Sequence, residues 1–194
     1  MKPLKIIMHD SWWLEDEDYN VNLKKTIQEL NIDFPLYHRN QKNSIRFNFE
    51  KLSPAETCKG AVEILAQIFR GKEFLYCCFG EIGIPFVRLK RYTTTKDYKI
   101  NCIEYYSSNN TDYFNYYHNN ISYVRILPDT FRFEKYAKDI SFAKGGENYQ
   151  FLISIKDKFA VHFYDCRGLD VVALNDNFLR DLKATFKTTE ILDY

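Results

Sequence analysis

YQFLISIKDKFAVHFYDCRGLDVVALNDNFLRDL, from Tyr149 to Leu182, is the part of the chain that decides the fold. Three runs of residues that favour β-structure follow one another closely, at Tyr149–Ile155, Phe159–Tyr164 and Leu169–Ala173. The turn Lys156-Asp157-Lys158 separates the first two runs, and only four residues separate the second from the third. Strands joined by connections this short pair antiparallel, so the sequence predicts a C-terminal β-meander.

The four residues between the last two strands are typical of a type I turn. Asp is favoured at the first position, because its carboxylate accepts hydrogen bonds from backbone N–H groups ahead of it, and Asp165 stands there. Gly is favoured at the fourth position, and we expect Gly168 to have a positive φ there. After the third strand, Asn175 or Asp176 is expected to cap a last helix.

Turn chemistry does not account for His162, Arg167 or Asp170, and two interpretations remain. In the first, the segment is a structural motif: Val161 and Phe163 face the core, and a satisfied histidine shares the other side of the strand with Tyr164. A turn-local ion pair then joins Asp165 to Arg167. In the second, His162, Asp165 and Asp170 form a catalytic site, with the histidine as a base or metal ligand. We favour the first interpretation and predict no catalytic residue, metal or cofactor.

Outside this stretch the pattern of apolar residues predicts further helices and strands. Ser53, Pro54 and Glu56 form a capping box that begins a helix, and Gly71 ends it. Another helix is predicted at Tyr19–Leu30, with Val21, Leu23, Ile27 and Leu30 on its apolar side, and a further one from Asp129, as its cap, to Phe142. Strands are predicted at Lys5–Met8, Ser44–Phe49, Phe74–Phe79, Phe86–Leu89, Ile100–Tyr106 and Ser122–Leu127. We predict a single α+β domain over residues 1–194, with a mainly antiparallel sheet, packed helices, and the meander followed by a helix.

Composition excludes several classes of protein. Of the 194 residues, 45% are hydrophobic, which excludes an intrinsically disordered chain. The net charge of +1 provides no overall field that would recruit nucleic acid or an anionic membrane. The five cysteines lack any C-x-x-C pair, which is typical of free thiols in a reducing compartment. No apolar run is long enough for a signal peptide or a membrane-spanning helix, so we expect a cytoplasmic protein without a membrane partner.

Two segments resemble protein-binding surfaces. Trp12 and Trp13 are the only tryptophans, and four acidic residues follow them closely. Neighbouring residues of an extended chain face opposite sides, so the two rings do not easily share one core, and one interpretation places a ring at the surface, where it suits protein binding. The alternative is that both tryptophans fold over an edge of the core. The polar segment Ser107–Asn120 carries three more candidate binding residues, Tyr113, Tyr116 and Tyr117.

The segment Val87–Lys99 interleaves basic residues with Tyr92 and Tyr98, a composition that also occurs in proteins that bind single-stranded nucleic acid. A solvated strand face has the same composition, and the near-neutral net charge favours that interpretation. The sequence contains no P-loop, no G-x-G-x-x-G motif, no G-x-S-x-G motif and no zinc-ligand spacing. Cys166 lacks a partnered base that would make it a nucleophile.

The segment Tyr149–Leu182, together with the closing ILDY, resembles the family known as domain of unknown function 3885. These are bacterial proteins of about this length, whose C-terminal part has a pattern like F-H-x-Y-D-D-R-G-x-D-V. The residues that match the pattern are His162, Tyr164, Asp165, Arg167, Gly168, Asp170 and Val171, while Cys166 stands where the family usually has Asp. The resemblance is good over residues 149–194 and loose elsewhere. It implies a coherent fold and a bacterial origin, and it implies no mechanism.

These observations lead to two functional hypotheses. The first is a non-enzymatic protein-binding module, for which an immunity protein that neutralises a bacterial toxin is the specific form, since the chain is small and lacks catalytic motifs. The partner would then be another protein, and nucleic acid is not expected. The second hypothesis is a small hydrolase or nuclease that uses His162, Asp165 and Asp170.

Overall fold

The computed structural model describes residues 17–30, 32, 43–79, 84–95, 98–104, 120–143, 150–186 and 191–193. The helices within these ranges are α1 (Glu17–Glu29), α2 (Pro54–Ile68), α3 (Ile84–Tyr92), α4 (Phe133–Ser141) and α5 (Asp176–Thr185). The strands are β1 (Ser44–Asn48), β2 (Phe74–Phe79), β3 (Asn101–Glu104), β4 (Asn120–Ile126), β5 (Gln150–Ser154), β6 (Phe159–Asp165), β7 (Gly168–Ala173) and β8 (Ile191–Asp193).

The strands of the described part form one eight-stranded sheet in the order β3-β4-β2-β5-β6-β7-β1-β8. Every pair of neighbouring strands is antiparallel. The sequence therefore predicted the fold class correctly, as α+β with an antiparallel sheet. The predicted C-terminal meander is confirmed as β5-β6-β7, and α5 follows it. The apolar run Phe74–Phe79 is β2, which lies inside the sheet between β4 and β5.

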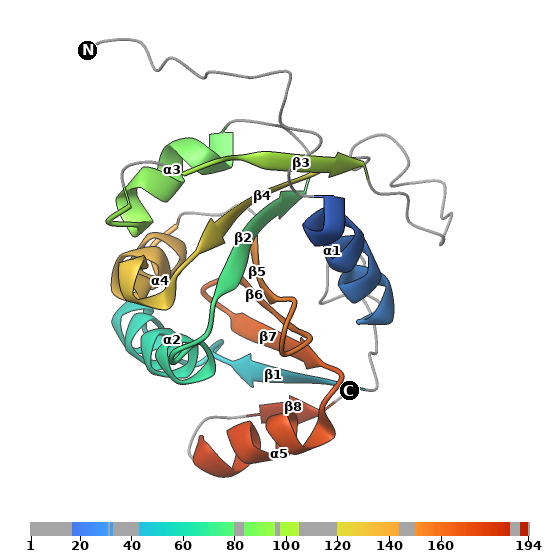
Figure 1. Ribbon diagram of the computed structural model, residues 1–194. Helices are drawn as coiled ribbons and strands as arrows, with labels where there is room; N and C mark the ends of the chain where they lie inside the picture. The colour runs from blue at the N-terminus through green and yellow to red at the C-terminus, as the bar shows by residue number, and fades with distance from the viewer. Residues whose placement is uncertain are drawn as a thin grey trace, which may run out of the picture.

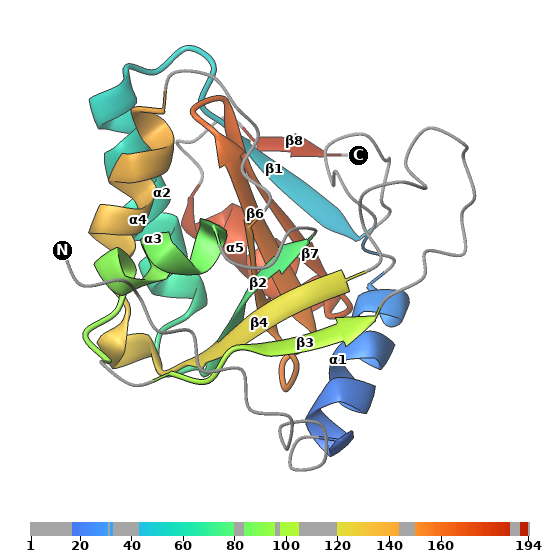
Figure 2. The same ribbon diagram turned by 90° about the horizontal axis from the view of Figure 1, so that it is seen from above.

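Helices cover both faces of the sheet (Figures 1 and 2). On one face α2, α3 and α4 lie together, and α5 contributes Leu179 and Leu182 to the same core. Aromatic rings fill much of this core. The ring of Phe69, for example, lies 4.4 Å from that of Phe74 and 5.3 Å from that of Phe159, measured between ring centroids. This dense packing of rings is the main hydrophobic core of the protein.

On the other face α1 packs a smaller core, and polar contacts anchor it there. Leu23, Ile27 and Leu30 of α1 are buried against the sheet. The Tyr19 hydroxyl donates a hydrogen bond to Glu73, and burial together with this carboxylate raises the pKa of Tyr19 to about 12. Arg125 forms a bidentate pair with Glu73, and these hydrogen bonds lower the pKa of the Glu73 carboxyl group. The helix is therefore held against the sheet by its buried apolar side chains and by the polar contacts among Tyr19, Glu73 and Arg125.

The helix α2 follows from local sequence signals. Its N-cap is Ser53, whose side chain accepts a hydrogen bond from the backbone N–H of Glu56, while the Glu56 side chain accepts one from the backbone N–H of Ser53. This is the predicted capping box, and it holds because both partners lie within one turn. Gly71 follows the helix with a φ of 65°, a conformation that glycine adopts without steric cost.

The structure corrects three expectations. Phe86–Leu89 is not a strand but lies inside α3, where Leu89 and Tyr92 are buried and Arg88, Lys90 and Arg91 are exposed, a helical spacing. A strand would have placed Arg91 on the same side as Leu89 and buried its charge.

Asp129 does not cap α4, because it lies in a short 3₁₀ helix and Arg132 occupies the N-cap position. Val21 is 62% exposed rather than turned inward, and Thr26 is buried on α1 instead.

Two further points concern the ends of the chain. The strand β8 had no counterpart in the sequence-based prediction, because three residues are too few to show alternation, yet β8 pairs with β1. The predicted strand Lys5–Met8 lies outside the described residues. Within the described ranges, none of the helices combines the length and the apolar character that crossing a membrane requires.

Candidate functional site

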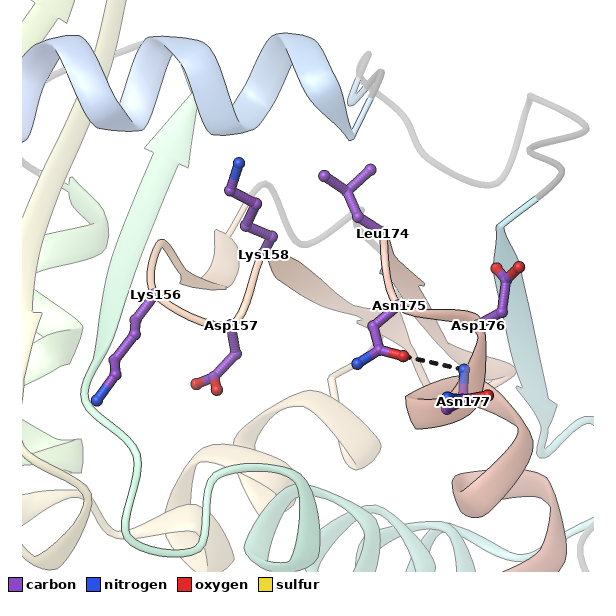
Figure 3. A pocket seen from close by; sticks show the side chains of 7 residues that line it. All are labelled: Lys156, Asp157, Lys158, Leu174, Asn175, Asp176 and Asn177. Carbon is purple, nitrogen blue, oxygen red and sulfur yellow. Dashed lines mark hydrogen bonds between the residues drawn. The ribbon is translucent and has the colours of Figure 1, made fainter.

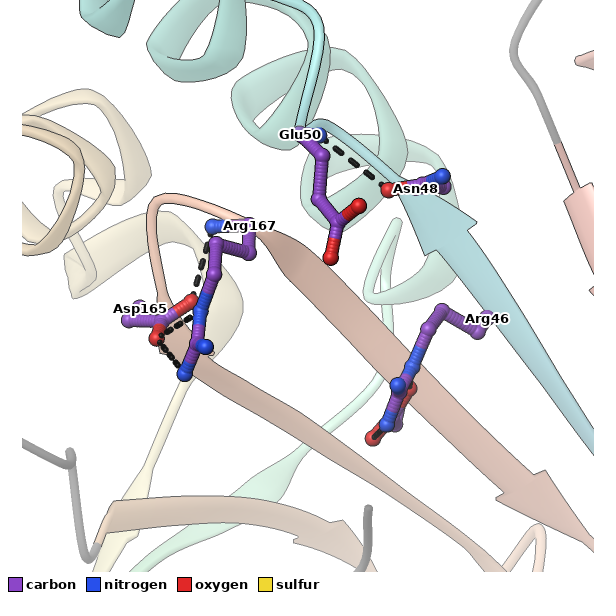
Figure 4. A network of polar contacts seen from close by, with 6 residues as sticks. Arg46, Asn48, Glu50, Asp165 and Arg167 are labelled. Carbon is purple, nitrogen blue, oxygen red and sulfur yellow. Dashed lines mark hydrogen bonds and ion pairs between the residues drawn. The ribbon is translucent and has the colours of Figure 1, made fainter.

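The β6–β7 hairpin joins Asp165 to Gly168 through the two-residue turn Cys166-Arg167. The Asp165 carboxylate accepts a hydrogen bond from the backbone N–H of Arg167 at 2.7 Å and another from its Nε, also at 2.7 Å. Figure 4 shows the two side chains facing each other at the tip of the hairpin. The predicted turn-local ion pair is thus confirmed, and it lies at an exposed tip, where it contributes little to stability.

Gly168 has a role that differs from the predicted one. Among the described glycines only Gly71 has a positive φ, so the expected left-handed conformation at Gly168 is wrong. The pairing of β6 with β7 shifts register between Phe163 and Asp165, an irregularity of the kind that increases the local twist of a strand. Glycine is required for space instead, since a Cβ at Gly168 would lie 2.6 Å from the Tyr164 hydroxyl oxygen and 3.2 Å from the Phe47 carbonyl oxygen.

Asp170 forms an ion pair with Arg46, a residue that the sequence did not point to. The two lie opposite each other in the register of β7 and β1. Arg46 Nε donates to Asp170 Oδ1 at 2.7 Å and Nη2 donates to Oδ2 at 2.8 Å, in the bidentate geometry that makes such pairs strong. Burial raises the pKa of the Asp170 carboxyl group, and the hydrogen bonds from Arg46 oppose that rise. A buried carboxylate is thereby neutralised across the sheet.

His162 and Tyr164 complete this group of polar side chains. His162 is fully buried, lies opposite Asp170 in the pairing of β6 with β7, and stacks on Phe151 with ring centroids 4.2 Å apart. The Arg46 guanidinium lies 5.1 Å from the centre of the Tyr164 ring, a cation–π distance. Burial raises the pKa of the Tyr164 hydroxyl, and the nearby Asp170 charge adds to that effect. We call Arg46, His162, Tyr164 and Asp170 the buried polar cluster.

The cluster occupies the face of the sheet that also carries α1. Val161 and Phe163 point into the large core on the opposite face, so the predicted division of β6 into two sides is confirmed. The three residues of the enzyme hypothesis have different contacts: Asp165 pairs with Arg167, Asp170 pairs with Arg46, and His162 stacks on Phe151. In the part of the chain that the structure describes, no group of three or more His, Cys, Asp or Glu side chains could hold a metal ion.

An open hollow of about 530 Å³ lies elsewhere on the surface (Figure 3). The turn between β5 and β6 forms one side of it and the start of α5 the other, with the lining residues Lys156, Asp157, Lys158, Leu174, Asn175, Asp176 and Asn177. Asn175 caps α5, as one of the two predicted candidates, and the Lys158 ammonium pairs with Glu29 of α1 at 2.6 Å. Among the residues that the structure describes, none that the sequence nominated as functional lines this hollow.

The candidate protein-binding residues lie outside the described residues. They are Trp12, Trp13, Tyr113, Tyr116 and Tyr117. Their role in binding stays a prediction. The residue that sequence reasoning missed is Arg46, and its only local signal was a basic position in the alternating segment Ser44–Phe49.

Comparison with known proteins identifies one family. No curated protein and no solved structure matches the chain. A family model described as a domain of unknown function (DUF3885) matches residues 19–194. The match therefore extends far beyond the C-terminal segment 149–194 in which the resemblance is clearest, and it takes in every described helix and strand except the first residues of α1. The chain belongs to the family of the domain of unknown function 3885.

Proposed function

We propose that this chain is a non-enzymatic protein-binding module. The proposal rests on one observation: Asp170 and His162, two side chains that could take part in catalysis, are instead used in contacts within the sheet. Asp170 is held by two hydrogen bonds from Arg46, and His162 is fully buried against the Phe151 ring. A general base must reach a proton of the substrate, and a histidine without solvent-exposed surface is poorly placed to do so.

The partner that we propose is a bacterial toxin, which makes the chain an immunity protein. The small size of the chain and its lack of catalytic motifs support this form of the proposal. The proposed contact residues are Trp12, Trp13, Tyr113, Tyr116 and Tyr117, because large aromatic side chains surrounded by polar groups contribute most of the energy of many interfaces.

The test is a quantitative capture of binding partners with the full chain as bait, in a lysate of the organism that encodes it. We expect one dominant protein, which is then purified and titrated against wild-type chain and against the double variant Trp12→Ala/Trp13→Ala. Two anchors at about 2 kcal/mol each predict a loss of affinity of roughly a thousandfold. Circular dichroism must show that the variant remains folded. An unchanged affinity would reject the tryptophan surface.

The enzyme hypothesis is tested with the same protein. The purified chain is assayed on phosphodiester and ester substrates, with and without added zinc or manganese, beside the variants His162→Asn and Asp165→Asn. We expect no turnover. Hydrolysis by the wild-type chain that both folded variants lack would overturn the proposal, and it would make His162 and Asp165 the catalytic residues.

A further inference from the structure

Helices α3 and α4 carry a concentration of positive charge that the whole chain lacks. Residues 84–95 and 128–143 contain six basic and three acidic side chains, whereas the net charge of the 194 residues is +1. All six basic side chains are exposed: Arg88, Lys90 and Arg91 from α3, Arg132 at the N-cap of α4, and Lys135 and Lys138 within α4. We call these six residues the α3–α4 basic face.

Most of this charge is not neutralised within the protein. Arg91 pairs with Asp139, whose Oδ2 lies 3.3 Å from Nη1. As far as residues 17–193 are described, the other five cations have no ion pair, whereas cations elsewhere on the surface do, such as Arg125 with Glu73 and Arg167 with Asp165. A cluster of unpaired like charges raises the local potential and attracts a surface of opposite charge.

The two helices form a rigid platform for these cations. The backbone N–H of Arg132 donates to the Tyr92 carbonyl oxygen at 2.6 Å, and the backbone N–H of Thr94 donates to the Thr130 carbonyl oxygen at 2.8 Å. The Tyr92 hydroxyl also donates to Asp139 at 3.1 Å, which ties the end of α3 to the last turn of α4. Figures 1 and 2 show α3 and α4 side by side on the same face of the sheet. A surface that is already ordered loses little entropy on binding.

Apolar side chains lie at both ends of α4. Leu127, just before the 3₁₀ helix that leads into α4, is 59% exposed, and Phe142, just after α4, is 54% exposed. Phe142 follows Lys138 by four residues, a spacing that places the two on the same side of a helix. Exposed apolar side chains beside unpaired cations are the composition of an interface in which an apolar anchor is surrounded by charged groups.

We propose that the α3–α4 basic face, with Phe142 as its apolar anchor, binds an acidic amphipathic segment of a partner protein. The carboxylates of the segment contact the arginines and lysines, and its apolar side chains contact Phe142. The proposal rests on the function proposed above and names a binding surface and the chemistry of the partner.

The structure favours a protein over single-stranded nucleic acid at this face. Such nucleic acid binding relies on exposed aromatic rings on which bases stack. Tyr92, the ring that the sequence places among the cations, is only 2% exposed, and its hydroxyl is bound to Asp139. Tyr98 is half-buried and packs against the large core. Leu127 offers nothing to a phosphate backbone but suits an apolar side chain of a protein.

The experiment measures fluorescence anisotropy of three labelled probes with the full chain at low ionic strength. The probes are a synthetic Glu/Leu peptide with leucines at helical spacing, the same peptide with serine in place of leucine, and a single-stranded DNA of equal charge. The variants are Arg88→Glu/Lys135→Glu and Phe142→Ser. The control is Lys24→Glu/Lys156→Glu, which reverses two exposed charges outside the face.

We expect the Glu/Leu peptide to bind most tightly, with an affinity that falls as salt is added. The Arg88→Glu/Lys135→Glu variant should weaken it by about tenfold or more, and Phe142→Ser by about tenfold. The control should stay within about twofold, since isolated surface charges contribute little. Tighter binding of the DNA would instead make the face a nucleic-acid site. Equal losses in the control, or no binding of the peptide, would also overturn the proposal.

Failure of this inference is distinguishable from failure of the proposed function. If the captured partner is lost with Trp12→Ala/Trp13→Ala but kept by Arg88→Glu/Lys135→Glu, the protein is a binding module that does not use the basic face for that partner, and the inference fails. If no partner is captured while peptide binding depends on the face, the proposed function fails and the surface stands.

Discussion

The substitution Gly168→Ala tests why the hairpin requires glycine. The added Cβ would lie 2.6 Å from the Tyr164 hydroxyl oxygen, closer than side-chain carbons approach in folded proteins. Tyr164 is buried and its ring lies beside the Arg46 guanidinium, so the hydroxyl cannot move without disturbing the Arg46–Asp170 pair. Overpacking of this kind costs about 1–3 kcal/mol, and we expect the substitution to lower the free energy of unfolding by about 2 kcal/mol.

A double-mutant cycle with Tyr164→Phe separates steric crowding from backbone strain. Without the hydroxyl, the tightest remaining contacts of the new Cβ are 3.2 Å to the Phe47 carbonyl oxygen and 3.3 Å to Cζ of the ring. Small shifts relieve contacts of that length. We therefore expect Gly168→Ala to cost only about 1 kcal/mol in the Tyr164→Phe background, a coupling of about 1 kcal/mol between the two positions.

The measurement is urea unfolding of the four proteins, followed by circular dichroism, with m-values compared to confirm two-state behaviour. Gly60→Ala serves as the control. Gly60 lies within α2, and a Cβ there would meet only Phe49 at 3.6 Å, an ordinary contact. That substitution should stabilise the protein by about 0.5–1 kcal/mol, because alanine favours helix over glycine. Additive costs in the cycle would refute the steric explanation of Gly168.

Three further predictions concern single residues. Arg46→Leu should cost about 3–5 kcal/mol near neutral pH, because it leaves Asp170 buried without its partner. Burial raises the folded-state pKa of the Asp170 carboxyl group, and in the variant the hydrogen bonds from Arg46 no longer oppose that rise. Protonation of Asp170 therefore favours folding of the variant, and ionisation of Asp170 opposes it. The difference in the free energy of unfolding between wild type and Arg46→Leu should therefore be smaller at about pH 5 than at about pH 8. An equal difference at both pH values would contradict this account. Lys158→Gly should stabilise the protein by up to about 1 kcal/mol in urea unfolding, because Lys158 has a φ of 51° and its ion pair with Glu29 is exposed. Lys158→Ala should give no gain in the same assay, since alanine meets the same steric cost at positive φ. Phe69→Ala should cost about 3–5 kcal/mol in urea unfolding, since the ring is fully buried among other rings, and a cost below about 1 kcal/mol would show that the core collapses around the gap.

Elements with local signals could be predicted from the sequence. The capping box at Ser53 and Glu56 begins α2 as expected, because its donors and acceptors lie within one turn. The Asp165–Arg167 pair could also be predicted, since a two-residue turn brings the side chains together whatever the rest of the chain does. The segment that became α3 was misjudged, because its alternating residues also fit a strand. Burial of Leu89 and Tyr92 against neighbouring elements decides for the helix.

The sequence by itself determined the fold class, the C-terminal meander and the division of β6 into a core side and a polar side. Only the tertiary structure decided which residues surround that polar side. Arg46 meets Asp170 across 124 positions of sequence, because β1 lies between β7 and β8 in a register that sets the two residues opposite each other. The order and register of distant strands depend on how the whole sheet buries both of its faces beneath the helices. No short segment carries that information, because the contacts that select it form only when the complete fold is assembled.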